Sequence, residues 1–323
     1  MASLQVHTHA ETLETIRSKV RASIRGKDKI IDLAIVTILA RGHLLIEDVP
    51  GVGKSSLARS LARAVGGSFS RIQFTSDLLP ADLLGVNVWQ SRKDCFSFHE
   101  GPVFANVVLA DEINRAPPRT QSALLEAMEE RQVSIDGTSR ALPLPFTVLA
   151  TQNPQDHHGT YPLPESQRDR FLVRLSMGYA PAQVEAALIQ TPATPHVASE
   201  RADAKSEEPA VSSARLLELQ NAAANIFLHA DLAHYAQKIV QATRDHPDIQ
   251  LGVSTRGALA WASAARARAL TMDRTQVAIE DLQNLAVPVL AHRLMLTQRT
   301  ALDTSASAEE LVHDLIAEIA VPV

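Results

Sequence analysis

The most constraining feature of this sequence is a glycine-rich loop between an apolar run and a helical stretch. Residues 43–46 (HLLI) form a short, bounded apolar run of the kind that becomes a buried parallel strand, and LARSLARAV follows the loop with helical character. Glycines let backbone N–H groups curl around phosphates, and the amino end of the following helix adds a favourable dipole. The order of strand, glycine loop and helix therefore predicts a phosphate-binding site in an α/β fold.

The loop also carries the side chains that phosphate chemistry needs. Lys54 can reach the β- and γ-phosphates of ATP, and the hydroxyl of Ser55 can ligate Mg²⁺. The strict pattern G-x-x-x-x-G-K-[ST] has glycine at position 48, where this chain has Asp48, so a ligand-free turn is the alternative. We predict a nucleotide-binding loop made of Pro50, Gly51, Val52, Gly53, Lys54, Ser55 and Ser56.

A pair of acidic residues supports the same interpretation. Asp111 and Glu112 end an apolar run, VVLA, about 55 residues after the loop. In a parallel sheet the carboxyl end of such a strand lies beside the phosphate loop, where ligands bind. We predict that Asp111 holds Mg²⁺ through its water shell and that Glu112 orients and polarises the attacking water.

The rest of the chain predicts two units. Apolar runs at 69–74, 107–110, 146–150 and 171–175 alternate with helical stretches at about 119–130 and 164–170, which predicts a parallel sheet with helices on both faces. From residue 181 onward the strand signals fade and helical periodicity dominates. A chain of 323 residues is long enough for both units. We expect an α/β P-loop domain over 1–180 and a small all-α domain over 181–323.

Two further segments stand out at the level of organisation. Residues 11–40 predict two short helices broken at Gly26, at the start of the first domain. Residues 191–213 hold three prolines and many small or charged residues, which predicts a mobile connecting loop.

Composition bears on two questions: whether the partner is a nucleic acid, and in which cellular compartment the protein works. A formal net charge of −5 gives no general attraction to phosphate backbones, so no nucleic-acid partner is expected. Cys95 is the only cysteine, which excludes an intrachain disulfide framework and suits a small apolar filler. The first residues do not read as a secretory signal, and no stretch offers about 20 uninterrupted apolar residues. We expect a cytoplasmic protein with no transmembrane segment.

Several long blocks resemble one family. GHLLIEDVPGVGKSS, GPVFANVVLADEINRAPPRTQSALLEAMEERQVS, TVLATQNPQDHHGTYPLPESQRDRF and GVSTRGALAWASAARARAL look like the MoxR family of AAA+ ATPases, over roughly residues 20–300. The resemblance implies an AAA+ domain followed by a helical lid domain. It also implies a homo-oligomeric ring, usually a hexamer, with ATP sites at subunit boundaries. The implied role is a chaperone-like one, acting on partner proteins that often contain von Willebrand factor A domains.

Three polar residues gain a role from this resemblance. Asn153 matches the family's first sensor, which can hydrogen-bond the γ-phosphate or the water. Arg170 matches the proposed arginine finger, although Arg168 and Arg174 remain rivals because the family usually has an apolar residue where Arg168 stands. Arg256 matches the second sensor; a cation at the start of a helix is unfavourable unless an anion is near, and a bound triphosphate would supply one.

Two insertions also fit the resemblance. Residues 77–104 read as a hairpin that interrupts a helix, with a polar turn at 90–94, and residues 132–147 read as a second hairpin with the turn Asp136-Gly137. In related rings such hairpins point towards the central pore and carry the remodelling movement; decorative surface hairpins are the alternative.

The combined prediction is Mg²⁺-dependent hydrolysis of ATP to ADP and phosphate, coupled to movement of the lid. A helicase-related motor is the first alternative, but this sequence shows no zinc-binding module, no helix-turn-helix signal and no basic tail. A scaffold that never hydrolyses ATP conflicts with the presence of Glu112 and Asn153. A chelatase-type motor subunit would use the same parts, so that alternative stays open. His157-His158 lacks a third ligand at a recognisable spacing and is interpreted as a solvated loop.

Overall fold

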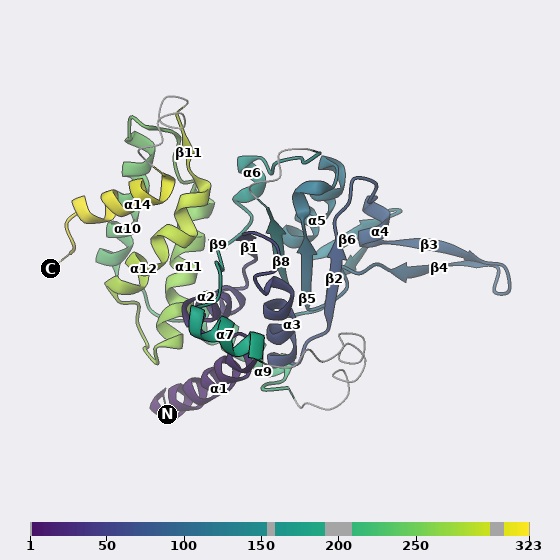
Figure 1. The fold of residues 1–323 in the computed structure, drawn as a ribbon, viewed down its shortest axis with the longest axis horizontal. Coiled ribbons are helices and arrows are strands. Elements are labelled where there is room, and N and C mark those ends of the chain that lie inside the picture. The colour runs from purple at the N-terminus through teal and green to yellow at the C-terminus, as the bar shows by residue number, and fades with distance from the viewer. Residues whose placement is uncertain (1, 154–158, 191–208, 298–306, 323) are drawn as a thin grey trace.

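The computed structural model describes residues 2–153, 159–190, 209–297 and 307–322. An α/β domain carries a five-stranded sheet, and a mainly helical lid packs against one side of it (Figure 1). The first part of the chain contains α1 (Ala2–Ser23), α2 (Asp28–Leu39), β1 (Leu44–Glu47), α3 (Lys54–Ala64), β2 (Phe69–Gln73), α4 (Pro80–Leu84), β3 (Gly85–Gln90), β4 (Cys95–Glu100), β5 (Val107–Asp111), η1 (Ile113–Arg115), α5 (Pro118–Glu130), β6 (Gln132–Ile135), β7 (Thr138–Ala141), β8 (Thr147–Gln152), α6 (Glu165–Arg168) and β9 (Val173–Leu175).

The main sheet is parallel, as predicted. Its strand order is β2-β5-β8-β1-β9, so the chain crosses over between strands that are not neighbours in sequence. Successive residues of β5 enter different cores: Val107 and Leu109 join one cluster, whereas Val108 and Ala110 join the other. The first cluster contains residues of α1, α2 and α3, and the second contains residues of α5. Both faces of the sheet are therefore covered by helices.

The lid follows β9 and shares the first core. It contains α7 (Ala182–Gln190), α9 (Ser213–Ala224), α10 (Ala230–Asp245), β10 (Ile249–Leu251), α11 (Thr255–Thr271), α12 (Ile279–Leu290), η2 (Ala291–Arg293), β11 (Met295–Leu296) and α14 (Ala308–Glu318). The antiparallel pair of β10 and β11 is an addition that the sequence did not reveal, because both strands are very short.

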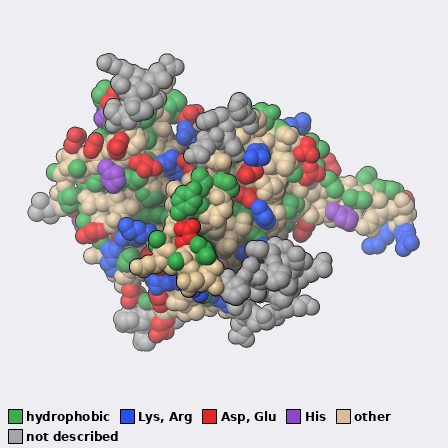
Figure 2. Space-filling model, viewed as in Figure 1, with side chains coloured by type: hydrophobic (Ala, Val, Ile, Leu, Met, Phe, Trp, Pro, Cys, Tyr) green, Lys and Arg blue, Asp and Glu red, His purple; other side chains and the backbone are tan. Residues whose placement is uncertain are grey.

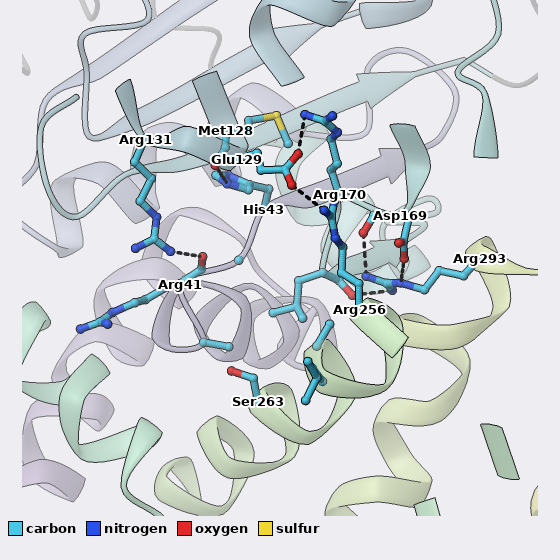
Figure 3. Close-up of a pocket in the computed structure, with 15 residues that line it drawn as sticks. Arg41, His43, Met128, Glu129, Arg131, Asp169, Arg170, Arg256, Ser263 and Arg293 are labelled. Atoms are coloured by element: carbon cyan, nitrogen blue, oxygen red, sulfur yellow. Dashed lines mark hydrogen bonds and ion pairs between the residues drawn. The ribbon is translucent and has the colours of Figure 1, made fainter. Parts of the chain in front are cut away.

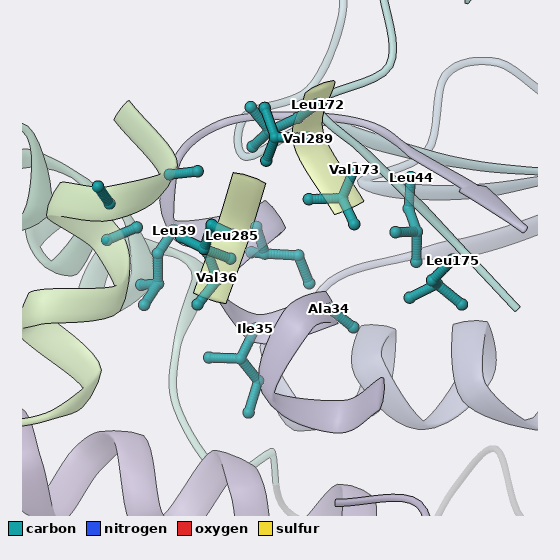
Figure 4. Packing of buried hydrophobic residues seen from close by; sticks show 14 of the residues in the cluster. Ala34, Ile35, Val36, Leu39, Leu44, Leu172, Val173, Leu175, Leu285 and Val289 are labelled. Atoms are coloured by element: carbon teal, nitrogen blue, oxygen red, sulfur yellow. The ribbon is translucent and has the colours of Figure 1, made fainter. Parts of the chain in front are cut away.

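The lid and the α/β domain meet through apolar side chains rather than across a solvated gap. Ile35 and Leu39 of α2 belong to the same buried cluster as Leu285 and Val289 of α12 (Figure 4). Trp261 of α11 is fully buried there. A hydrogen bond also joins the two domains: the buried Gln220 of α9 donates to the carbonyl of Ile38 in α2 at 2.7 Å. Burial of this kind holds the lid to the sheet domain.

The amino-terminal segment is broken at Gly26 as predicted, but its first helix is longer than expected, because α1 begins at Ala2 and has 22 residues. Helices α1 and α2 are separated at Gly26, which has a φ of 72° and would place a Cβ only 3.1 Å from Pro181 and Val184. The break therefore needs glycine both for its backbone conformation and for the close approach of α7. Of the loop expected at 191–213, residues 191–208 lie outside the described part. Val211 is buried and its N–H donates to the carbonyl of Ala64.

Both predicted hairpins are present and touch each other. Strands β3 and β4 pair from Gly85↔Glu100 to Gln90↔Cys95, and β6 pairs with β7. The Nδ2 of Asn87 donates to Asp136 at 2.7 Å, and the guanidinium of Arg140 lies 4.0 Å from the ring centre of Phe98. Figure 2 shows this first hairpin projecting from the body, with Lys and Arg side chains at its far end.

Two details of the first hairpin differ from the expectation. It does not interrupt a helix: the short α4 precedes it, and residues 101–106 lead directly to β5. Cys95 is exposed rather than an apolar filler, because the two-stranded ribbon has no layer over it at this point.

Candidate active site

The carboxyl ends of the parallel strands bring the predicted phosphate-site residues to one edge of the sheet. The register pairs Gln73 with Asp111, and Glu47 with Gln152. Strand β8 lies between β1 and β5. Neighbouring strands are about 4.8 Å apart, so the start of the phosphate loop lies about 10 Å from Asp111 across the sheet. This edge is where open α/β sheets bind their ligands.

The phosphate loop joins β1 to α3 through glycine backbone. Gly51 and Gly53 have φ values of 87° and 97°, and α3 begins at Lys54. The Nζ of Lys54 donates to the carbonyls of Asp48 at 3.0 Å and Val49 at 3.2 Å, so the ammonium group lies folded over the loop. Ser55 and Ser56 follow in the first turn of α3, where the N–H groups of a helix are unpaired and available to an anion.

Asp48 explains how the loop manages without its first glycine. Its carboxylate accepts from the N–H of Val49 at 2.9 Å, the hydroxyl of Ser176 at 3.0 Å and the N–H of Gly178 at 2.6 Å. Burial opposes ionisation, but these hydrogen bonds outweigh it and lower the pKa of Asp48. The side chain thus fastens the loop to the segment after β9, a constraint that a glycine would not supply.

Lys27 adds a second fastening that the sequence reading missed. It precedes α2, is 9% exposed, and donates from Nζ to the carbonyl of Gly178 at 2.6 Å and of Val52 at 3.4 Å. Burial lowers the pKa of Lys27, and the nearby carboxylate of Asp48 opposes that shift. A lysine directly after the helix-breaking glycine, in a position unfavourable to the helix dipole, was the available signal.

Asp111 ends β5 with its carboxylate already oriented. The hydroxyl of Thr151 donates to Oδ1 at 2.6 Å, and Arg71 donates to Oδ2 at 2.7 Å. Asp111 is 8% exposed. Hydrogen bonds from two neighbouring strands therefore fix the direction in which this carboxylate faces the crevice.

Glu112 stands at the turn out of the sheet. Its φ of 57° lies in the left-handed region, which costs a non-glycine residue about 1–3 kcal/mol and persists where surrounding contacts impose it. Its N–H donates to Thr151 at 2.9 Å, and its carboxylate accepts from Gln73 and pairs with Arg115, each at 3.0 Å. Asn153 directly follows β8, half-buried, at the same edge.

The side chains at this edge suit Mg²⁺ bound together with a nucleotide. Mg²⁺ prefers oxygen ligands and is usually held by one or two protein groups plus phosphates and water. The hydroxyl of Ser55 and the carboxylate of Asp111 provide such oxygens. Among the described residues, no group of three His, Cys, Asp or Glu side chains forms a metal cage. The donor set fits a nucleotide-bound ion better than a permanent one.

A cavity opens beside the phosphate loop. It has a volume of about 470 Å³ and is lined by Ile24, Lys27, Gly51, Gly53 and Tyr179, among others. Apolar walls with a few polar groups are typical of small-molecule sites. The cavity extends from the glycines towards α1 and α7, which places room for a nucleoside next to the phosphate-binding backbone.

Arg170 and Arg256 lie at the other end of the sheet. The N–H of Leu172 donates to the carbonyl of His43, so the segment with Arg170 flanks the amino end of β1. At about 3.3 Å per residue, the run from His43 to Asp48 spans about 17 Å. Both arginines line a separate cavity of about 420 Å³. Neither lies beside the phosphate loop of its own chain.

The two arginines meet on one carboxylate. Arg170 pairs with Oε2 of Glu129 at 2.9 Å, and Arg256 pairs with its other oxygen (Figure 3). Arg170 also donates to the carbonyl of Leu125 at 2.7 Å. Glu129 thus supplies the anion that a cation at the start of α11 requires. The sequence reading missed Glu129, because a glutamate on the exposed face near the end of a helix is common.

The two rivals for the finger occupy other settings. Arg168 pairs with Glu165 one helical turn away at 3.5 Å. Arg174 lies within β9 and pairs with Glu47 of β1 at 2.9 Å and with Glu309 of α14. Arg170 differs from both rivals, because its partner Glu129 also pairs with Arg256 and all three residues line an open cavity. His157 and His158 lie outside the described residues.

The chain matches known proteins over both of its units. The family model described as "ATPase family associated with various cellular activities (AAA)" matches residues 43–173, and "AAA lid domain" matches 241–315. YeaC, an uncharacterized protein of Bacillus subtilis, is 44% identical over 92% of this chain and 91% of its own length. Chaperone MoxR1 of Mycobacterium tuberculosis is 41% identical over 96% of this chain and 82% of its own length.

The chain belongs to the MoxR family of AAA+ ATPases. Protein MoxR of Paracoccus denitrificans is 30% identical over 93% of each chain. The crystal structure of a candidate ATPase from Cytophaga hutchinsonii superposes with a TM-score of 0.88 at 32% identity, covering 100% of this chain and 98% of the other. This MoxR protein is accordingly a nucleotide-binding, chaperone-like ATPase with an AAA+ fold. AAA+ ATPases typically work as rings. None of the helices in the described residues is long and apolar enough to span a membrane.

Proposed function

We propose that this MoxR protein hydrolyses ATP with Mg²⁺ at the boundaries of a homo-oligomeric ring, a hexamer as is usual for the family, and uses the cycle to remodel a partner protein. One observation carries the proposal: Arg170 and Arg256 lie together, about a strand length from the phosphate loop of their own chain. Groups so placed can serve a γ-phosphate only if it belongs to another subunit.

The residues at the carboxyl edge form the first half of the site. The backbone of 50–54 and the ammonium of Lys54 bind the phosphates, while Ser55 and Asp111 hold the Mg²⁺–nucleotide complex. A bound Mg²⁺ would supply neutralisation of the phosphate charge at this edge. Glu112 orients and polarises the attacking water, and Asn153 hydrogen-bonds the γ-phosphate or that water.

The arginine pair forms the second half. Phosphoryl transfer to water needs positioning and charge stabilisation, and a guanidinium that reaches the γ-phosphate supplies both. Arg170 acts as the finger and Arg256 as the second sensor, both towards the neighbouring subunit. Because the two guanidinium groups start from different domains, a nucleotide between subunits is contacted by both domains of the neighbour. Hydrolysis then changes the contacts that the nucleotide makes with both domains of the neighbour.

Sedimentation velocity tests the ring. The Glu112→Gln variant with ATP and Mg²⁺ should sediment as a hexamer of the 35.0 kDa chain, and Lys54→Ala under the same conditions should give smaller species. Purely monomeric Glu112→Gln at saturating ATP would contradict the proposed site, because half of it would be missing.

The partner is tested separately. We propose a protein with a von Willebrand factor A domain, for which a candidate encoded next to this gene is the natural choice. Such a protein should bind the ATP-loaded Glu112→Gln ring and be released when the wild-type ring hydrolyses ATP. Equal binding to Lys54→Ala, or binding that ATP turnover does not reverse, would remove this partner from the proposal.

A further inference from the structure

A buried arginine from the lid reaches the segment that carries Arg170. Arg293 of η2 is 4% exposed, and its Nε donates to Oδ1 of Asp169 at 2.7 Å. Its Nη2 donates to the carbonyls of Asp169 at 3.2 Å and Phe171 at 2.7 Å, and its Nη1 donates to Leu172 at 3.3 Å and to Val289. One lid side chain therefore fixes the backbone on both sides of Arg170.

The second oxygen of Asp169 contacts the other end of the same arrangement. The hydroxyl of Ser254 donates to Oδ2 at 3.0 Å, while the same oxygen of Ser254 accepts from the N–H of Gly257 and so caps α11. Arg256 is the second residue of that helix. Asp169, the residue directly before Arg170, thus contacts both η2 and the start of α11. Figure 3 shows its contact with Arg293 of η2.

The close packing at this point leaves little freedom. A Cβ on Gly257 would lie 2.8 Å from Cδ of Arg293, so the start of α11 rests against the arginine stem. His292 is buried beside it; burial and the adjacent Arg293 hold the pKa of His292 well below its usual value, so this neighbour stays neutral. Asp169 is the carboxylate that Arg293 pairs with among the described residues.

We infer that Asp169 is a positioning residue: through Arg293 and Ser254 it locks Arg170 and Arg256 into one unit that meets the neighbour's nucleotide. This inference rests on the function proposed above. A buried ion pair is weak evidence for stability, since apolar residues of similar volume often replace one without loss. The four hydrogen bonds from Arg293 to residues 169–172 instead fix the direction of that segment, which is what a group acting across a subunit boundary requires.

The test uses full-length variants in mixed rings. Asp169→Asn removes the charge, and the double variant Asp169→Asn/Arg293→Met avoids leaving Arg293 buried without a partner, so it should fold where the single change destabilises. Glu309→Gln is the matched control, because it breaks another contact between the lid and the sheet domain, that with Arg174. Thermal unfolding and ATP affinity are measured first on every variant.

We expect both Asp169 variants to bind ATP within about two-fold of wild type while turnover falls about ten-fold or more. In an equal mixture with Glu112→Gln, the Asp169 variants should recover part of the ATPase activity, because roughly one quarter of the interfaces in a random ring combine an intact Glu112 with an intact arginine unit. In a mixture with Arg170→Ala, the Asp169 variants should recover no ATPase activity. Glu309→Gln should keep near-normal turnover.

Three results would overturn the inference. Turnover of the double variant within about two-fold of wild type would show that the lock is not needed. Recovery with Arg170→Ala would place the defect in the chain's own phosphate site. Recovery with neither partner, despite confirmed subunit exchange, would place it outside the arginine unit. If instead Arg170→Ala itself fails to recover with Glu112→Gln, the proposed function fails and not the lock alone.

Discussion

Arg170 and Arg256 come from different domains but share the carboxylate of Glu129, one guanidinium on each oxygen. The carboxylate is partly exposed, so the arrangement contributes little to stability by itself. Its effect is local: two cations that would otherwise repel one another are held side by side and partly neutralised. A γ-phosphate arriving from a neighbouring subunit would compete with Glu129 for both.

Replacing Lys54 by Ala should abolish useful ATP binding. The ammonium group that lies over the loop is lost, and charge-assisted hydrogen bonds of this kind contribute about 1.5–3 kcal/mol each, so affinity should fall about 100-fold or more. Titration calorimetry with ATP and Mg²⁺ measures this. Lys19→Ala, on α1 away from the loop, serves as the control; binding by Lys54→Ala within a few-fold of wild type would contradict the loop assignment.

Glu112→Gln should separate binding from turnover. The amide can still accept from Gln73 and hydrogen-bond water, but it cannot act as a carboxylate towards that water, so kcat should fall by about 10²–10⁴ with little change in ATP affinity. Phosphate release and nucleotide titration give the two numbers. Glu130→Gln, at the exposed end of α5, is the matched control. Unchanged phosphate release would remove Glu112 from the mechanism.

Arg170→Ala and Arg256→Ala should behave alike when each is mixed with other inactive variants. Each keeps an intact phosphate loop, so each should bind ATP normally, and loss of the finger should lower turnover about 10³-fold. Mixing either with Glu112→Gln should restore part of the activity, whereas mixing the two arginine variants with each other should not. Restored activity on mixing Arg170→Ala with Arg256→Ala would mean that the arginines serve different sites. Arg168→Ala and Arg174→Ala test the rival fingers in the same assay.

The carboxyl of Asp48 should leave a signature in the pH dependence of stability. Its folded pKa lies below the ordinary value of 3.8, so the ionised form stabilises the fold above that value and the contribution disappears as pH falls through the folded pKa. The difference in unfolding free energy between wild type and Asp48→Asn should therefore be largest near neutral pH and shrink below pH 3.8. Denaturant titrations measure it, with Asp94→Asn in the exposed hairpin turn as control. A difference that grows on acidification would contradict the hydrogen-bonding account.

The elements that the sequence predicted well are those with a strong local signal. The parallel sheet, the glycine loop and both hairpins follow from apolar runs and turn residues that act over a few positions. The position of Arg170 could not be derived in this way. It depends on β9 pairing with β1, a contact between residues far apart in the chain. The same holds for Glu129, which pairs with one arginine of the lid, and for Asp169, whose partners Arg293 and Ser254 both belong to the lid.

Buried polar residues were the harder class. Arg293 stands in the apolar stretch VPVLAHRLML, where an arginine has to find acceptors if the segment is buried. That pattern could have marked it as important, but not which residue it would meet. Lys27 posed the same problem: its two carbonyl partners lie 25 and 151 positions away.

Helix α5 has 13 residues and is about 20 Å long. Near its start, the buried Gln121 donates to the carbonyls of Ile113 and Ala116 and so grips the turn that follows Glu112. Near its other end stands Glu129, the shared partner of the two arginines. Under the proposed function, α5 would thus connect the segment after Glu112 at one nucleotide site to the arginines assigned to the next site. In a closed ring all copies of α5 would run in the same sense, so a change at one site would pass along the helix towards one neighbour and not the other.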